Sequence, residues 1–235
     1  MRTKILLLVV TAAMLASYAG AAMSQTSPSG TLDANSLPKA TSLAEVEAQG
    51  VLNALFPAKA QTFTATTSGA LTSAQIQMYK ECDAASDLRM QIATVDESGL
   101  PTNNILAETT LPASAFDTEP YPSLGDLVTV TFSDPAQVEA GQKYAFIFSL
   151  ESPTGDCDVH YDQPLKGDVY AGGSYAFFRV DEQWGLDPEL DHIFAIYVTP
   201  PSGPTSKAEC KKGGYKEFGF KNQGRCIKAV NHASK

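Results

Sequence analysis

Several aromatic side chains gather between residues 160 and 184, where they could form a sugar-binding surface. Such a surface needs rings that stack on pyranose faces and a few polar groups that fix the sugar's orientation. Trp184 is the leading candidate because it stands in the polar segment Asp-Glu-Gln-Trp-Gly, which is unusual for a core residue. The alternative is that this tryptophan packs in the domain core. The candidate set is Trp184, Tyr170, Tyr175, Tyr161 and His160.

Four aspartates crowd the same part of the chain and suggest a calcium site. Calcium prefers about six to eight hard oxygen ligands from flexible loops. The EF-hand pattern is absent and the spacing is not diagnostic, so the alternative is that these acids are solvated loop residues. A structural Ca²⁺ is the one cofactor that the sequence suggests, and its candidate ligands are Asp156, Asp158, Asp162 and Asp168.

The sequence offers no catalytic residues. Nucleophilic catalysis needs a serine or cysteine beside a base, and the G-x-S-x-G elbow is absent. Paired carboxylates can hydrolyse a glycosidic bond, and five acids lie near Trp184, namely Asp181, Glu182, Asp187, Glu189 and Asp191. In so acidic a chain most carboxylates are solvated surface groups, so we expect a non-catalytic protein. A hydrolase is the most distant alternative.

The four cysteines are Cys82, Cys157, Cys210 and Cys226. An even number in an exported chain favours disulfides, and four cysteines allow three pairings. We favour Cys82 with Cys157 and Cys210 with Cys226, because each bridge then stays within one compositional region. A zinc site is disfavoured, since no C-x-x-C pair occurs and the three histidines are scattered.

From Ala58 to Pro200, β-branched and aromatic residues alternate with polar ones, as in Val128-Thr-Val-Thr-Phe132. Turn residues such as Gly172-Gly173 separate the runs. Many short strands without intervening helices predict an all-β fold, an antiparallel and jelly-roll-like β-sandwich. The expected strands are Gln61–Thr67, Thr72–Tyr79, Leu88–Val95, Ile105–Leu111, Leu127–Ser133, Lys143–Leu150, Val159–Asp162, Ala176–Val180 and Asp191–Val198.

Residues 1–21 have the parts of a secretory signal peptide. Arg2 and Lys4 precede an apolar run from Ile5 to Ala16, and Ala19-Gly-Ala21 supplies the small residues of a cleavage site. The run is too short to cross a bilayer core of about 30 Å as a helix. We therefore expect a secreted, extracellular protein that has no membrane span after cleavage.

Residues 22–57 are expected to form a flexible lead-in, because their first half is rich in Ser, Thr, Pro, Ala and Gly. Ser42 and Glu45 match a capping box, and a short helix ending near Pro57 could be lined on one face by Leu43, Val46, Leu52 and Leu55. Residues 58–199 are then the sandwich domain. A stiff Pro-rich linker follows over residues 200–206.

Residues 207–235 are too few for an independent core, so a disulfide must staple them. They hold eight Lys or Arg against two Glu, a balance of +6, whereas residues 22–206 hold seven basic against 24 acidic residues, a balance of −17. The acidic body argues against nucleic acid as its partner. The basic tail could contact anionic wall polymers, a membrane surface or the body itself; the alternative is a solvated tail.

The span from Ala60 to Val198 resembles the choice-of-anchor R family. The resemblance rests on these segments in order: Ala60-Gln-Thr-Phe-Thr64, Leu71, Asp96-Glu-Ser-Gly-Leu-Pro101, Leu106-Ala107, Val138-Glu-Ala-Gly-Gln-Lys-Tyr144, Tyr170-Ala-Gly-Gly-Ser174, Trp184, Asp191 and Phe194. It implies a β-sandwich module of secreted or surface-attached bacterial proteins, and it implies no catalytic residues.

The tail is similar to a short two-cysteine module that closes many secreted bacterial proteins. The residues concerned are Cys210-Lys-Lys-Gly-Gly-Tyr215, Phe218-Gly-Phe220-Lys-Asn-Gln-Gly224 and Cys226-Ile-Lys228. Tyr215 stands where that module usually has Trp. The resemblance implies that the two cysteines form the module's disulfide.

The sequence thus predicts a secreted, non-catalytic binding or adhesion module whose partner is a glycan or a cell-wall polymer. The alternative is a structural protein of the cell envelope, held non-covalently by its basic tail.

Overall fold

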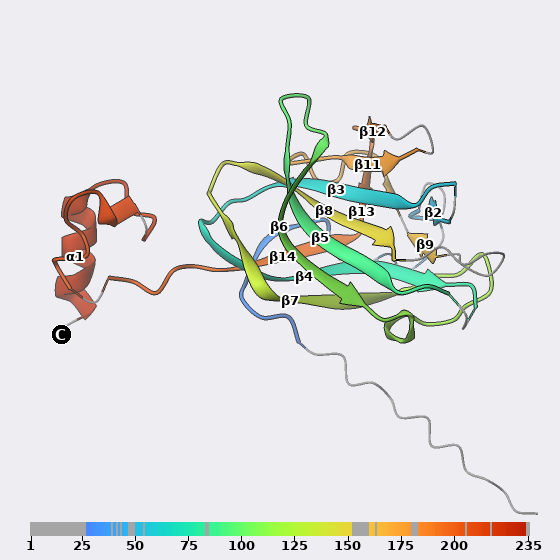
Figure 1. Cartoon of the computed structure of the whole chain (residues 1–235), viewed down its shortest axis with the longest axis horizontal. Coiled ribbons are helices and arrows are strands. Elements are labelled where there is room, and N and C mark those ends of the chain that lie inside the picture. The colour runs from blue at the N-terminus through green and yellow to red at the C-terminus, as the bar shows by residue number, and fades with distance from the viewer. Residues whose placement is uncertain are drawn as a thin grey trace, which may run out of the picture.

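Two antiparallel sheets form the body of the protein, and a small helical module follows them (Figure 1). The predicted all-β sandwich is therefore confirmed. The computed structural model describes residues 27–38, 40, 42, 44–46, 50–53, 55–82, 85–151, 160–162, 164–179, 183–204, 206–216 and 218–233. The predicted signal peptide lies outside these residues.

The first sheet is built around the long strand β4, which pairs with β7 on one edge and, on the other, with β14 and then with β9. β1 pairs with β14 and β2 with β9, so the sheet has six strands. Its members are β1 (Thr31–Asn35), β2 (Gly50–Leu52), β4 (Gly69–Lys80), β7 (Asp126–Val138), β9 (His160–Asp162) and β14 (Phe194–Thr199).

The second sheet has the order β12-β11-β3-β8-β5-β6, and every pair in it is antiparallel. A two-stranded ribbon accompanies the sandwich and joins β10 (Pro164–Lys166) to β13 (Leu190–His192). The sheet consists of β3 (Ala58–Thr64), β5 (Leu88–Val95), β6 (Pro101–Leu111), β8 (Lys143–Leu150), β11 (Tyr175–Phe178) and β12 (Trp184–Asp187).

The core lies between the two sheets and follows from the alternation of side chains along each strand. In β8, Phe146 and Phe148 point inward, while Ala145 and Ile147 belong to a separate cluster on the outer face. The first sheet contributes Ile76 and Phe194 to the same core. Burial of these large side chains is the main stabilising term of the body.

Two of the predicted strands are confirmed residue for residue. Leu88–Val95 and Lys143–Leu150 are strands with the predicted bounds. The last predicted strand, Asp191–Val198, is divided into the end of β13 and β14. Four short strands were missed, because strands of three to five residues carry too little periodicity to be recognised: β1, β2, β10 and β12.

The predicted lead-in is part of the fold, and the short helix within it is wrong. Gly50–Leu52 is strand β2, and Val46 forms an isolated bridge with Leu165. Its opening part supplies the edge strand β1, although Leu43 lies outside the described residues. The local sequence of this segment does not favour strands, but it pairs with open edges of the first sheet, and this pairing outweighs the local preference.

Ser36 fastens the end of β1 to the interior. Its hydroxyl donates to the carbonyl oxygen of His192 and accepts a 3.0 Å hydrogen bond from the amide of Phe194. The side chain is buried, so both backbone groups lose their partner if the hydroxyl is removed.

We predict that Ser36→Ala lowers the free energy of unfolding by about 1–3 kcal/mol. Urea denaturation measures this loss, with Ser202→Ala on the exposed linker as the matched control. An unchanged midpoint for Ser36→Ala would contradict the place of β1 in the domain.

The C-terminal module is built on the disulfide Cys210–Cys226, as the sequence predicted. Both cysteines are buried beside Val230, and the rings of Tyr215, Phe218 and Phe220 pack against them. The module contains a turn of 3₁₀ helix, Gly214–Lys216; the other such turn in the described chain, Ala113–Ala115, lies between β6 and β7. The helix α1 (Gln223–Ala233) was not foreseen; Asn222 caps it by accepting a 3.0 Å hydrogen bond from the amide of Arg225.

We predict that replacing both Cys210 and Cys226 by Ala unfolds the module and leaves the sandwich folded. Closing a loop of this length stabilises by about 3 kcal/mol, which is most of what so small a core can supply. Trypsin should cleave at the module lysines much faster, while the thermal transition of the sandwich stays unchanged. Equal cleavage rates with and without the bridge would refute this.

Candidate functional site

Small side chains line the outer face of the second sheet, where polar residues are usual. Two rows of paired residues cross this face. One runs Trp184, Phe178, Ala58, Ser149, Arg89, and the next runs Leu186, Ala176, Ala60, Ile147, Gln91, Glu108. Four alanines and one isoleucine on this outer face are almost fully buried. We call them the alanine patch: Ala60, Ala93, Ala145, Ile147 and Ala176.

The alanine patch is buried because two segments fold over it. Trp184 and Leu186 from β12 pack on one side, and Val95 at the end of β5 packs on it as well. The hairpin between β5 and β6 approaches β12 at its tip, where a Cβ on Gly99 would lie 3.7 Å from a methyl group of Leu186. Methyl side chains leave room for this approach, whereas larger ones would hold the segments apart.

The hairpin tip is held in shape by its own polar side chains. Asp96 accepts hydrogen bonds from the amides of Ser98 and Leu100, and Gly99 has a φ of +82°, which favours glycine. The hydroxyls of Thr94 and Thr102 lie 2.6 Å apart across the two strands. These contacts fix the position of the residues that follow in β6.

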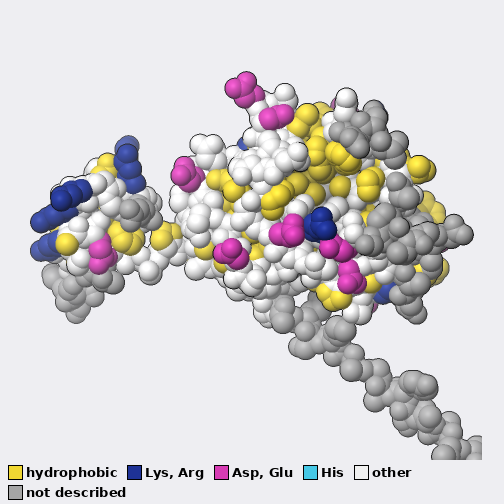
Figure 2. Space-filling model, viewed as in Figure 1, with side chains coloured by type: hydrophobic (Ala, Val, Ile, Leu, Met, Phe, Trp, Pro, Cys, Tyr) yellow, Lys and Arg dark blue, Asp and Glu magenta, His cyan; other side chains and the backbone are white. Residues whose placement is uncertain are grey.

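A groove of about 180 Å³ lies between the folded hairpin and β12. Trp184 and Phe178 line it on one side, with ring centroids 5.2 Å apart and planes inclined by 62°. Ile105 lines it on the other side and is 37% exposed. Figure 2 shows hydrophobic side chains gathered over this part of the sheet.

Polar groups surround the apolar walls of the groove. Its remaining lining residues are Ala58, Gln91, Thr102, Asn103, Ile147 and Ser149. Gln91 donates a hydrogen bond to the carboxylate of Glu108, which holds its amide group at the groove. The site therefore combines two aromatic rings with two amides and two hydroxyls.

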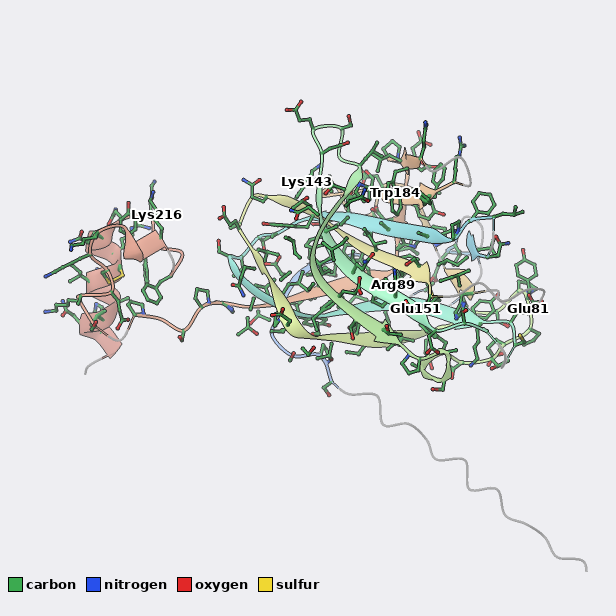
Figure 3. The ribbon with its side chains drawn as sticks, viewed as in Figure 1. Glu81, Arg89, Lys143, Glu151, Trp184 and Lys216 are labelled. Carbon is green, nitrogen blue, oxygen red and sulfur yellow. A yellow bond between two sulfur atoms is a disulfide. The ribbon has the colours of Figure 1, made fainter. Side chains whose placement is uncertain are left out.

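Arg89, which pairs with Ser149 across the sheet, forms an ion pair with Glu151 (Figure 3). The Arg89 guanidinium donates from two nitrogens to the two oxygens of Glu151, both at 2.9 Å. The hydrogen bond with Glu151 raises the pKa of Arg89 above its usual value. Both side chains are substantially exposed, so the pair adds little stability but places paired charges beside the groove.

Three other depressions are larger, at about 530, 430 and 340 Å³, but none of the described residues that line them is aromatic. The largest lies where residues of the sandwich, Pro200 and Lys216 meet. The groove at Trp184 is the one that matches the chemistry expected from the sequence.

The other aromatic candidates do not join Trp184. Tyr175 is buried, with its ring centroid 4.6 Å from that of His192, and His160 is fully buried against Phe116. Both rings are therefore buried away from the groove, and ligand contact by Tyr175 and His160 stays a prediction that the structure does not favour. The side chain of Tyr161 lies outside the described residues.

Tyr170 is also a packing residue. Its ring meets Phe194 edge-on at 5.2 Å, and its hydroxyl donates to the carbonyl of Thr64 and accepts from the amide of the same residue. The turn at Tyr170 lies so close to β3 that a Cβ on Gly173 would stand 1.7 Å from the carbonyl oxygen of Thr62. Tyr170 therefore ties this turn to the sandwich instead of facing the groove.

Asp191 joins the same turn to the interior. One carboxylate oxygen accepts from the amides of Val169 and Tyr170 at 3.0 and 2.9 Å, and the other accepts from the Gln61 side chain at 2.7 Å. Burial raises the pKa of Asp191 from 3.8 to about 6, although these hydrogen bonds oppose the shift. A raised pKa can mark a general acid, but here both oxygens are occupied and the side chain is 0% exposed. The shift therefore belongs to a structural clamp.

Of the four aspartates proposed for calcium, Asp168 is the one whose side chain the structure describes. Asp168 lines the 340 Å³ depression with Asp187 and Glu189. Asp156 and Asp158 lie outside the described residues, as does the side chain of Asp162. Among the described residues, no three Asp, Glu, His or Cys side chains are placed to hold a metal ion.

Two other predictions concern the disulfide of Cys82 and the membrane. Cys82 is in a disulfide, but Cys157, its predicted partner, lies outside the described residues. In the part of the chain that the structure describes, no helix has both the length and the apolar character to cross a membrane.

Sequence reasoning missed Phe178, Ile105, Asn103 and Gln91 as groove residues. The available signal was the run of alanines at outward positions of β3, β5, β8 and β11. These alanines can be recognised as one patch only when the strand pairing is known, because alternation alone does not show which face of the sheet is covered.

Comparison of the sequence with known protein families finds no matching family, and comparison with curated proteins finds no significant relative. The resemblances noted from the sequence therefore stay predictions.

We predict that Asp191 makes the sandwich more stable at acidic pH. Its folded pKa lies above its unfolded value, so the folded state holds the proton more tightly between pH 4 and 6. Stability should therefore rise as pH falls from 7.5 to 4.5, relative to Asp191→Asn, by roughly 2–3 kcal/mol.

Urea denaturation of both proteins at the two pH values measures this difference. Asp134→Asn, at an exposed position, is the control and should follow the wild-type pH dependence. A stability difference between wild type and Asp191→Asn that is constant with pH would show that Asp191 does not titrate in this range.

Proposed function

We propose that this protein is a secreted, non-catalytic glycan-binding module whose ligand lies in the groove beside Trp184. The observation that carries the proposal is the pairing of two half-exposed rings, Trp184 and Phe178, with amide and hydroxyl groups in one groove. A pyranose has an apolar face of C–H groups and a rim of hydroxyls. Rings that stack on the face and amides that bind the rim match both parts of such a ligand.

The size of the groove favours a single sugar ring. At about 180 Å³ it is smaller than the ~300–1,000 Å³ sites that enclose drug-sized ligands. A groove open along the surface lets a longer chain continue into solvent on either side. We therefore expect recognition of one residue within, or at the end of, an oligosaccharide.

The composition of the lining supports binding without catalysis. The described residues that line the groove include no carboxylate, thiol or imidazole. Glycoside hydrolysis requires two carboxyl groups on either side of the bond, and the buried Asp191 is committed to its hydrogen bonds. Glu108 and Glu151 are near the groove, but each already accepts hydrogen bonds from a neighbouring side chain.

Secretion is supported by the signal-like N-terminus and by the disulfide Cys210–Cys226, since disulfides persist in oxidising compartments. The resemblance to choice-of-anchor R modules points to the same setting, at or near the bacterial cell surface.

We predict that the protein binds selected saccharides on a glycan array and that Trp184→Ala weakens this binding at least tenfold. Loss of one stacking ring removes more than 1.4 kcal/mol of contact, which corresponds to that factor. Running the array with calcium and with a chelator tests separately whether a metal contributes.

Two further variants make the result specific. Tyr121→Ala removes an aromatic ring that is 57% exposed outside the groove and should leave binding unchanged. Gln91→Leu keeps the size of the side chain but removes its amide, so it should weaken binding without unfolding the sheet. A blank array, or equal binding by Trp184→Ala and Tyr121→Ala, would overturn the proposal.

A further inference from the structure

The C-terminal module carries a dense cationic surface. The seven lysines and arginines that the structure describes after residue 206 are all exposed: Lys207, Lys211, Lys212, Lys216, Lys221, Arg225 and Lys228. In Figure 2 the Lys and Arg side chains stand together on this module, while the sandwich shows mainly acidic groups. The module is therefore the part of the chain that attracts anions.

Three of these cations lie in or just before α1. Arg225 and Lys228 are three residues apart within the helix, which places them on one side of it. Lys221 lies two residues before the first residue of the helix, at its N-terminal end. Cys226 and Val230 face the disulfide core on another side of the helix. We call Lys221, Arg225 and Lys228 the basic stripe.

We infer that the basic stripe binds an anionic polymer with repeated phosphate groups, of the kind that decorates a bacterial envelope. Three exposed cations at one end and along one side of a helix match successive charges on one chain better than a single small anion. Such binding releases counterions and gains affinity with each neutralised phosphate. The acidic body, with a balance of −17, repels the same polymer and leaves the module as the contact point.

The apolar residues of the module argue against a membrane as the partner. A helix that lies in a lipid interface needs a free apolar face. Here Cys226, Ile227 and Val230 pack with the module's rings around the disulfide, so that face is already used.

The same packing argues against single-stranded nucleic acid. Proteins that bind it offer aromatic rings on which bases stack. Tyr215, Phe218 and Phe220 are only half-exposed and are packed against the module core. A phosphate polymer without bases needs only the cations.

The test uses the full mature chain and immobilised poly(glycerol phosphate) at several NaCl concentrations. The variant Lys221→Gln/Arg225→Gln/Lys228→Gln removes the basic stripe. The matched control, Lys207→Gln/Lys211→Gln/Lys212→Gln, removes the same charge from the segment before the helix. Glutamine is a good helix former, so α1 should persist.

We expect the stripe variant to bind at least tenfold more weakly at 100 mM NaCl and the control variant less than threefold more weakly. The slope of log K against log salt should fall by about two for three lost contacts. Trp184→Ala should bind the polymer like wild type, which separates this result from the groove.

Equal losses in the two glutamine variants would overturn the inference, because net charge alone would then explain binding. Tighter binding to vesicles of phosphatidylglycerol, or to single-stranded DNA, would also overturn it. Lys221→Arg/Lys228→Arg keeps the charge and should bind like wild type, so a loss there would point to a folding defect and contradict the assignment.

Discussion

The candidate site depends on short side chains on one face of the second sheet. Alanines 60, 93, 145 and 176 sit at outward positions of the second sheet, where a globular domain would usually expose polar side chains. Because a methyl group is short, β12 and the hairpin between β5 and β6 can close over the sheet. The space that they do not fill is the groove. Substituting larger residues there would separate these segments, so the alanine patch is both a packing requirement and the base of the site.

Sequence periodicity predicted the class of fold and most of the long strands, because sustained alternation is typical of a half-buried strand. It did not predict β12, which is only four residues long and contains Trp184, nor β1, whose residues become a strand by pairing with β14. The sequence left open whether Trp184 packs in the core or exposes its ring, and the structure shows parts of both. Trp184 packs on the alanine patch and also lines the groove. Periodicity also could not show that Tyr175 and His160 are buried, because an aromatic residue in a strand is equally suited to either face until register is known.

The sandwich and the module differ in the chemistry that they expose. The sandwich is acidic and its groove is lined by rings and amides, which we propose bind a neutral glycan, whereas the basic module is the part that we propose binds a polyanion. The linker between them contains Pro200, Pro201 and Pro204, which favour an extended and fairly stiff connection. If one envelope layer presents both ligands, binding of the module would raise the local concentration of glycan at the groove, because the two parts belong to one chain.

Trp184 is half-enclosed at an open groove, and it is the one tryptophan in the protein. Acrylamide quenching of its fluorescence in the native protein reads that environment directly. We expect quenching well below that of the urea-unfolded chain yet clearly above zero, and a further decrease when a saccharide identified by the array is added. Quenching equal to that of the unfolded chain, or none at all, would show that the ring is free in solvent or sealed in the core, and either result would contradict the groove.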